Sequence, residues 1–206
     1  DPATGAPRLA CGNWEKAFVV DPVAGGEALL VIVRSDVRAL AVFQEPAVGE
    51  ARLACGCGYR DGQVLVFDPV VGGEALVVID VGPRVNALTV FEDPATGDLR
   101  LASGSNDGSV RVWDLAAGGA ALFVFEGHTH WVEALTAFVD PATGEMRLAS
   151  GSVDNTLRVW DASKGGAELR VVVFDDDVSA LAVTSDMSRL FVASGKSWGE
   201  LRVGSS

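Results

Sequence analysis

The sequence repeats itself every 44 to 48 residues, and this repetition limits the possible folds more than any other feature of the chain. A shared alanine falls at positions 10, 54, 102, 149 and 193. The first two copies around it read RLACG, the next two read RLASG, and the last, FVASG, is weaker. A period of this length is typical of propeller blades and of some helical arrays, so the pattern within one unit has to decide between them.

The unit at 127–174 contains four short segments of alternating or β-branched apolar residues. They predict strands a to d at 132–138, 146–152, 156–161 and 168–174. The connectors between them are rich in Gly, Asp and Asn, which is the composition of tight turns. No stretch has the 3.6-residue period of an amphipathic helix. Four antiparallel strands per repeat correspond to one propeller blade.

We therefore expect an all-β fold, a β-propeller of four-stranded antiparallel blades, in a single repeat domain over residues 1–206. The expected blades are 1–34 with strands b to d, 35–80, 81–126, 127–174, and 175–206 with strands a to c. These ranges supply 18 strands, about four to five blades, and the strands at the two ends do not add up to one blade. The chain is therefore expected to be an incomplete ring, either part of a larger propeller or completed by a second copy.

Composition argues against several classes of partner. The 28 acidic residues outnumber the 16 basic ones, and the basic residues are scattered. Binding to nucleic acid or to an anionic membrane needs clustered Lys and Arg, so we expect neither partner. No apolar run is long enough to span a bilayer, and the chain does not open with a signal sequence. The three cysteines do not suggest a disulfide framework, so we expect a cytoplasmic or otherwise intracellular location.

The segment from Gly127 to Asp161 resembles the WD40 repeat family, whose unit runs from a Gly-His pair to a Trp-Asp pair. The resemblance covers the whole chain in period and strands, and this one unit in its full motif. It implies a hydrogen-bonded tetrad that ties the blade together, formed here by His128, Ser150, Asp154 and Trp160. Such a network gives a buried indole N–H, hydroxyl and imidazole the partners that burial requires.

The unit at 81–126 keeps part of this motif. Ser103, Asp107 and Trp113 occupy three tetrad positions, but Val81-Gly82-Pro83 stands where the Gly-His pair should be. The network of this unit is therefore expected to be a partial tetrad, short by one member.

The remaining units have lost most of the motif. Cys55 and Phe67 replace the serine and the tryptophan in one unit, and Cys11 and Val20 replace them in another. The last unit keeps only the serine, as Ser194. We therefore expect apolar packing to stabilise these blades, with Cys11 and Cys55 as small packing residues.

The sequence contains no clear catalytic, metal-binding or cofactor-binding constellation. His128, His130 and Glu133 lie close together, but a zinc site needs three or four converging ligands and no further histidine is available. The acidic loop at 175–177 lacks the spaced oxygen ligands of a calcium site. Neither GxxxxGK[ST] nor GxGxxG occurs. Ser, His and Asp come together only in the tetrad, so we expect no metal, no cofactor and no catalysis.

Positions that differ from blade to blade are the candidates for partner binding. The second residue of strand a and the residue before the turn aspartate vary in every unit, and in the WD40 family both lie on the top face, where partners dock. Aromatic and Arg residues supply much of the energy of protein interfaces. The candidates are Arg38, Tyr59, Arg60, Arg84, Asn86, Asn106, Trp131, Glu133 and Ser179. The alternative is that these are ordinary solvated loop residues.

The leading hypothesis is a non-catalytic scaffold that binds a protein or peptide partner through the top face of the propeller. Two alternatives stay open. The chain could be the regulatory or sensory propeller domain of a larger signalling enzyme. It could also be a self-assembling structural repeat, a homo-oligomer in which unpaired strand edges join chain to chain.

Overall fold

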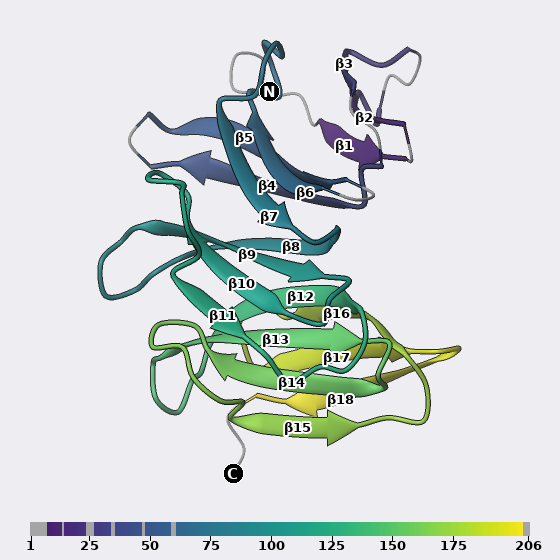
Figure 1. The fold of residues 1–206 in the computed structure, drawn as a ribbon, viewed down its shortest axis with the longest axis vertical. Coiled ribbons are helices and arrows are strands. Elements are labelled where there is room, and N and C mark those ends of the chain that lie inside the picture. Colours follow the sequence, from purple (N-terminus) through teal and green to yellow (C-terminus); the bar gives the residue numbers. More distant parts are fainter. Residues whose placement is uncertain are drawn as a thin grey trace. The chain divides into compact units, whose positions relative to one another are not determined.

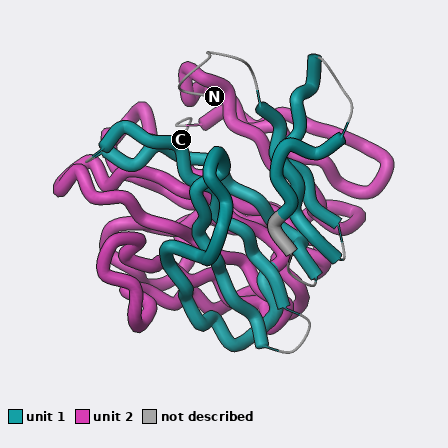
Figure 2. Tube along the Cα trace, turned by 90° about the horizontal axis from the view of Figure 1, so that it is seen from above, with its two compact units in different colours: residues 1–85 teal, residues 86–206 magenta. Residues whose placement is uncertain are grey.

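A computed structural model shows an all-β fold. It describes residues 8–13, 15–23, 27–33, 36–46, 48–58 and 61–203. These residues form 18 strands in five sheets of three or four strands each, and within each sheet the strands follow one another in chain order (Figure 1). The prediction of four-stranded antiparallel blades is confirmed. The chain divides into two compact units, residues 1–85 and 86–206 (Figure 2). The expectation of one repeat domain with five particular blade ranges stays a prediction.

The first unit contains two sheets. The three-stranded sheet consists of β1 (Leu9–Gly12), β2 (Lys16–Val20) and β3 (Leu30–Val33). The four-stranded sheet consists of β4 (Ala39–Glu45), β5 (Glu50–Cys57), β6 (Gly62–Phe67) and β7 (Val77–Gly82). Ala17 and Val19 of the first sheet share a buried apolar core with Leu53 of the second.

The second unit contains three sheets. The first consists of β8 (Val85–Glu92), whose first residue belongs to the first unit, β9 (Leu99–Ser105), β10 (Val110–Asp114) and β11 (Phe123–Phe125). The second consists of β12 (Val132–Val139), β13 (Met146–Ser152), β14 (Thr156–Asp161) and β15 (Arg170–Val173), each within two residues of the predicted bounds. The third consists of β16 (Val178–Val183), β17 (Arg189–Ser194) and β18 (Ser197–Arg202). The part of the chain that the structure describes contains no helix able to cross a membrane.

The turns between strands a and b follow from their local sequence. In the segment DPATG at 140–144, Asp140 Oδ1 accepts a hydrogen bond from the Ala142 N–H (2.9 Å), and the Gly144 N–H donates to the Asp140 carbonyl (2.7 Å). Gly144 has a φ of 72°, which glycine adopts without steric cost. The repeated loop sequence therefore encodes a tight hairpin turn.

A glycine in strand b lets successive sheets approach closely. A β-carbon at Gly104 would lie 2.6 Å from Cγ1 of Val132, the first residue of the next sheet, which is shorter than a normal contact. The same contact, within 3.0 Å, recurs in the pairs Gly12 and Val37, Gly56 and Val85, and Gly151 and Val178. The glycine of the repeat is therefore required for packing between sheets.

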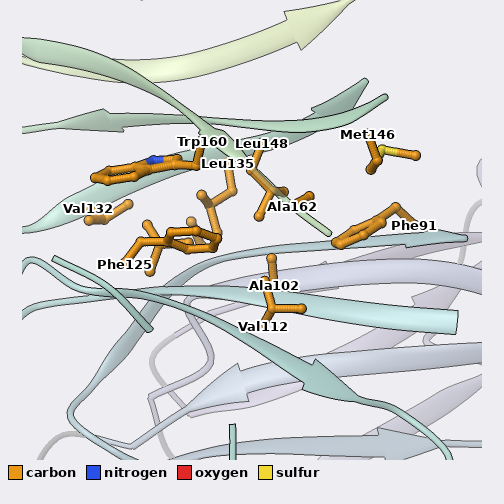
Figure 3. Close-up of a cluster of buried hydrophobic side chains, with 12 residues drawn as sticks. Phe91, Ala102, Val112, Phe125, Val132, Leu135, Met146, Leu148, Trp160 and Ala162 are labelled. Carbon is orange, nitrogen blue, oxygen red and sulfur yellow. The ribbon is translucent and has the colours of Figure 1, made fainter. Parts of the chain in front are cut away.

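The junction between the β8–β11 and β12–β15 sheets has a large apolar core (Figure 3). Phe125 and Trp160 face each other, with their ring centroids 5.3 Å apart. Ala102 from one sheet and Leu148 from the other are fully buried in the same cluster. Burial of each large side chain contributes about 1.5 to 3 kcal/mol, so this junction is a main source of stability in the second unit.

Candidate functional site

Four side chains form a continuous hydrogen-bond network on the β12–β15 sheet. Trp160 donates its indole N–H to Ser150 Oγ (2.8 Å). Ser150 Oγ lies 2.7 Å from His128 Nε2, and His128 Nδ1 lies 2.9 Å from Asp154 Oδ2. Since the indole can only donate, the Ser150 hydroxyl is assigned as donor to Nε2, and the imidazole proton then lies on Nδ1 facing the carboxylate. The structure thus brings together the four tetrad residues that the resemblance implies.

Burial and hydrogen bonding set the charges in this network. Burial lowers the pKa of His128, and the hydrogen bond to Asp154 opposes this effect only in part. Burial would also raise the pKa of Asp154, but hydrogen bonds from Thr156, the Thr129 N–H and His128 outweigh it and lower the pKa to about 2. At neutral pH, a neutral imidazole therefore donates to an ionised carboxylate, and such charge-assisted bonds are stronger than neutral ones.

The order Ser150, His128, Asp154 is also the connectivity of a serine-hydrolase triad. A nucleophilic serine has to reach a substrate carbonyl. Ser150 is fully buried, and its Oγ already accepts the Trp160 indole N–H. This arrangement therefore ties strands and a loop together and presents no reacting atom to solvent.

The network also fixes the loop that precedes strand β12. The Thr129 N–H donates to Asp154 Oδ2 (2.9 Å), and the Val153 N–H donates to the Trp131 carbonyl (3.0 Å). The loop at 127–131 is therefore attached at two points to the turn between β13 and β14. Hydrogen bonds that begin in the core thereby determine where a surface tryptophan lies.

The β8–β11 sheet holds only part of such a network. Trp113 donates its indole N–H to Ser103 Oγ (3.0 Å), as in the complete tetrad. Asp107 instead accepts hydrogen bonds from the Ser109 N–H (3.0 Å) and from Arg111 (2.8 Å). Burial would raise the pKa of Asp107, but bonds from Arg111 and Ser109 outweigh it and lower the pKa. This aspartate is therefore satisfied within its own turn and strand.

Cysteines take the serine place in the first unit, with different results. Cys55 and the neighbouring Phe67 are buried, and burial together with nearby Cys57 raises the pKa of Cys55 to about 12, which keeps the thiol protonated. The packing prediction is wrong for Cys11, which is exposed. Its face of the β1–β3 sheet is open to solvent.

Strand register corrects the assignment of Ser194 in the last sheet. Ser152 and Ser194 each pair with the first residue of their strand a, so Ser194 is the counterpart of Ser152. Both hydroxyls donate to a carbonyl of the preceding loop, at 3.2 and 2.7 Å. Val192 occupies the place of Ser150, so the serine of the tetrad has no counterpart in the described part of this sheet.

Five surface candidates lie on or beside strands of the second unit, namely Asn86, Asn106, Trp131, Glu133 and Ser179. Trp131 is 43% exposed, and its ring centroid lies 5.1 Å from that of His130. Asn86 Nδ2 donates to Glu133 Oε1 (3.4 Å), so the second residues of two neighbouring a strands meet. Ser179 is exposed on β16.

The candidates of the first unit are partly engaged in an ion-pair cluster. Arg38 Nε lies 2.9 Å from Asp36 Oδ1, and Arg84 Nε lies 3.2 Å from Asp36 Oδ2. Asp36 is buried, so both arginines compensate a buried charge and serve the fold. The remaining candidates, Tyr59 and Arg60, lie outside the described residues.

A pocket of about 610 Å³ between the β12–β15 and β16–β18 sheets has no counterpart among the candidates from sequence. By register, Val172 takes the place of Phe125, and Leu201 takes the place of Trp160. Both replacements are smaller, and both line the pocket. The void therefore arises from the lost aromatic pair. The signal that could have predicted it is that the last repeat has Leu201, and no tryptophan, at the position of Trp160.

Comparisons with known proteins agree with this geometry. Residues 81–114 and 119–161 match the family model described as WD domain, G-beta repeat. The chain is similar to the computationally designed Ika4 protein, with 26% identity, a TM-score of 0.63, and coverage of 83% of this chain and 93% of that chain. It is also similar to the WD40 β-propeller domain of Doa1, with 17% identity and a TM-score of 0.72. That match covers 94% of this chain and 59% of the Doa1 chain. No curated protein sequence matches significantly.

The two matched segments are also the two that carry the hydrogen-bond networks. The first contains the bonded pair Ser103 and Trp113, and the second contains the complete tetrad. The similarity to a solved WD40 propeller extends over nearly the whole chain. Residues 81–114 and 119–161 are WD40 repeats, and the chain as a whole has the fold of a WD40 β-propeller.

Proposed function

We propose that the chain is a non-catalytic scaffold that binds a protein or peptide partner through the surface around Trp131. WD40 propellers in general are protein-interaction scaffolds, which supports this class of function. The observation that carries the proposal is an exposed indole on a loop held by hydrogen bonds from the tetrad. Tryptophan is strongly enriched among residues that dominate interface energies, and a preordered loop loses little entropy on binding.

The surroundings of this indole suit a protein partner. The His130 ring packs beside it, and the Asn86 and Glu133 pair supplies polar groups near the start of β12. An apolar centre with a polar rim is the usual anatomy of a protein interface. The net charge of −12 favours partners with basic surfaces and disfavours nucleic acid and anionic membranes. We also propose that the chain acts inside the cell.

Selection of binders from a displayed peptide library, followed by calorimetry, tests this proposal. Trp131→Ala should weaken the selected binders by about 10-fold or more, the loss typical of a central interface residue. Leu122→Ala is the matched control, because Leu122 is another large apolar side chain of the same unit and is 44% exposed, close to the 43% of Trp131. Binders whose affinity is unchanged by Trp131→Ala would overturn the proposal.

A further inference from the structure

Neighbouring sheets of this chain pack through the same pair of faces. Within a unit, the leading face of one sheet packs on the trailing face of the next sheet in the chain. In the second unit, the leading face of β12–β15 includes Ala149, Leu157 and Val159. The trailing face of β16–β18 includes Leu190, Val192 and Leu201.

The leading face of the β16–β18 sheet is exposed. Strand register places Trp198 at the counterpart of Leu157, and Phe191 at the counterpart of Ala149. Leu157 is 1% exposed, whereas Trp198 is 76% exposed. The Phe191 and Trp198 rings lie together, with centroids 6.3 Å apart. Phe191 is half-buried, but the Trp198 ring is largely exposed, and an exposed aromatic side chain of this kind marks an interaction surface.

The trailing face of the β1–β3 sheet is exposed as well. Leu9 is the counterpart of Leu148 in the repeat, but Leu9 is 52% exposed and Leu148 is fully buried. Cys11 pairs across the strands with Phe18, and Phe18 pairs with Val31, so these three side chains continue the same apolar face. The chain therefore exposes one leading face, on β16–β18, and one trailing face, on β1–β3, which are the two kinds of face that pack together elsewhere in the chain.

The two exposed faces differ from the inner ones in complementary ways. At an inner junction, a glycine such as Gly151 receives the valine that begins the next strand a, here Val178. In the β16–β18 sheet, Ala193 takes the place of this glycine, and bulky Phe191 and Trp198 stand where the inner sheet has small or medium side chains. Among the described residues, the β1–β3 sheet has no strand beside β1. Since the described part of this sheet supplies no valine at that place, the larger side chains have room.

We propose that a second copy of the chain covers these faces. The leading face of β16–β18 in one copy packs on the trailing face of β1–β3 in another, and buries Trp198 and Phe191 against Leu9, Phe18 and Val31. A second copy fits these faces because the contact repeats the sheet-to-sheet junction already present in each unit. Because it joins two different patches, the copies associate head to tail.

Light scattering over a concentration series tests this association. The unmodified chain should have at least twice the monomer mass, and Trp198→Asp should return it to the monomer, because an unpaired carboxylate would be buried against Leu9, Phe18 and Val31. Trp131→Asp is the matched control and should keep the assembly, since Trp131 lies on neither face. A chain that stays monomeric at every concentration overturns the proposal, including one that closes on itself.

A complementation experiment tests the head-to-tail arrangement. Leu9→Asp blocks the trailing face and Trp198→Asp blocks the leading face, so each variant alone should be monomeric. Mixed together, the two variants retain one intact pair of faces and should form a heterodimer. Circular dichroism of each variant shows that it is folded before mixing. A mixture of folded variants that stays monomeric overturns the arrangement. Because Trp131 is untouched, this result is independent of the proposed partner surface.

Discussion

The β8–β11 and β12–β15 sheets have nearly the same strands but different hydrogen-bond networks. Strand b reads RLASGS in both sheets, and its leucines, Leu101 and Leu148, are fully buried. A tryptophan on strand c donates to a strand b serine in both. In the second sheet, the serine also bonds to a histidine, His128, which has no counterpart in the first. The strands therefore form without the histidine, and apolar packing with one buried hydrogen bond is sufficient for a sheet.

The histidine instead controls a loop. His128 and the Thr129 N–H both hold Asp154, which anchors the segment that leads to Trp131. In the other sheet, Asp107 is held by Arg111 of the following strand, and it binds no such segment among the described residues. The repeat therefore has two separate roles. Apolar packing builds the sheet, and the polar network positions the surface that we propose to bind a partner.

Removing the aspartates should give the largest contrast between the two sheets. Asp154→Ala removes the carboxylate that accepts from His128 Nδ1, the Thr129 N–H and the Thr156 hydroxyl, and the free energy of unfolding should fall by about 3 kcal/mol. Asp107→Ala should cost about 1 kcal/mol, because its ion pair with Arg111 is partly exposed. Urea unfolding measures both losses, and hydrogen exchange in β13 and β9 locates them. Equal losses would contradict the contrast.

The glycines of strand b should behave alike in the two sheets. Gly104→Ala and Gly151→Ala each place a methyl group against a valine, and each should cost about 2 kcal/mol, a typical value for overpacking. The compensating changes Val132→Ala and Val178→Ala should recover part of the respective loss. If only one glycine variant is destabilised, the two junctions do not share the packing described above. Chemical denaturation of the single and double variants measures these effects.

The serines should differ by a smaller amount. Ser150→Ala leaves both the Trp160 indole N–H and His128 Nε2 without a partner, whereas Ser103→Ala affects only Trp113. Each orphaned buried group costs about 1 kcal/mol, so the expected losses are about 2 and about 1 kcal/mol. The same denaturation assay checks this ratio, and a larger loss for Ser103→Ala would argue against it.

The sheets could be predicted from sequence because their determinants are local. Alternating apolar residues define each strand, and turn residues such as Asp140 and Gly144 mark where a hairpin reverses. The tetrad was implied by one full copy of the motif, and the hydrogen bonds of Ser150 in the structure follow that pattern.

The features that sequence reasoning missed depend on strand pairing or on distant residues. The repeat alignment places Ser194 at the tetrad serine, but strand pairing shifts it by two residues. A shift of two residues keeps the side chain on the same face of the sheet, so the apolar pattern does not reveal it. The ion pair of Arg84 with Asp36 joins the loop before β8 to the loop before β4. The exposure of Cys11 depends on what covers its sheet, which the repeat pattern does not state.

Acid should weaken the β12–β15 sheet through a group that the β8–β11 sheet lacks. Because the pKa of His128 is lowered in the folded chain, the unfolded chain binds its proton first, and stability should begin to fall below about pH 6.5, the ordinary histidine value. Asp154, with a pKa of about 2, adds a second loss between about pH 3.9 and 2. His128→Gln should remove the first loss and keep the second.

Urea midpoints from pH 7 to 5 measure the first of these losses, with hydrogen exchange in β13 and β9 as the local readout. The unmodified chain should lose stability over this range in β13 but much less in β9, because Asp107 titrates only at lower pH. Parallel profiles for the unmodified chain and His128→Gln would mean that the imidazole takes up its proton equally in both states. The histidine would then still position the loop at Trp131 through Asp154, but it would not contribute to the acid sensitivity of that surface.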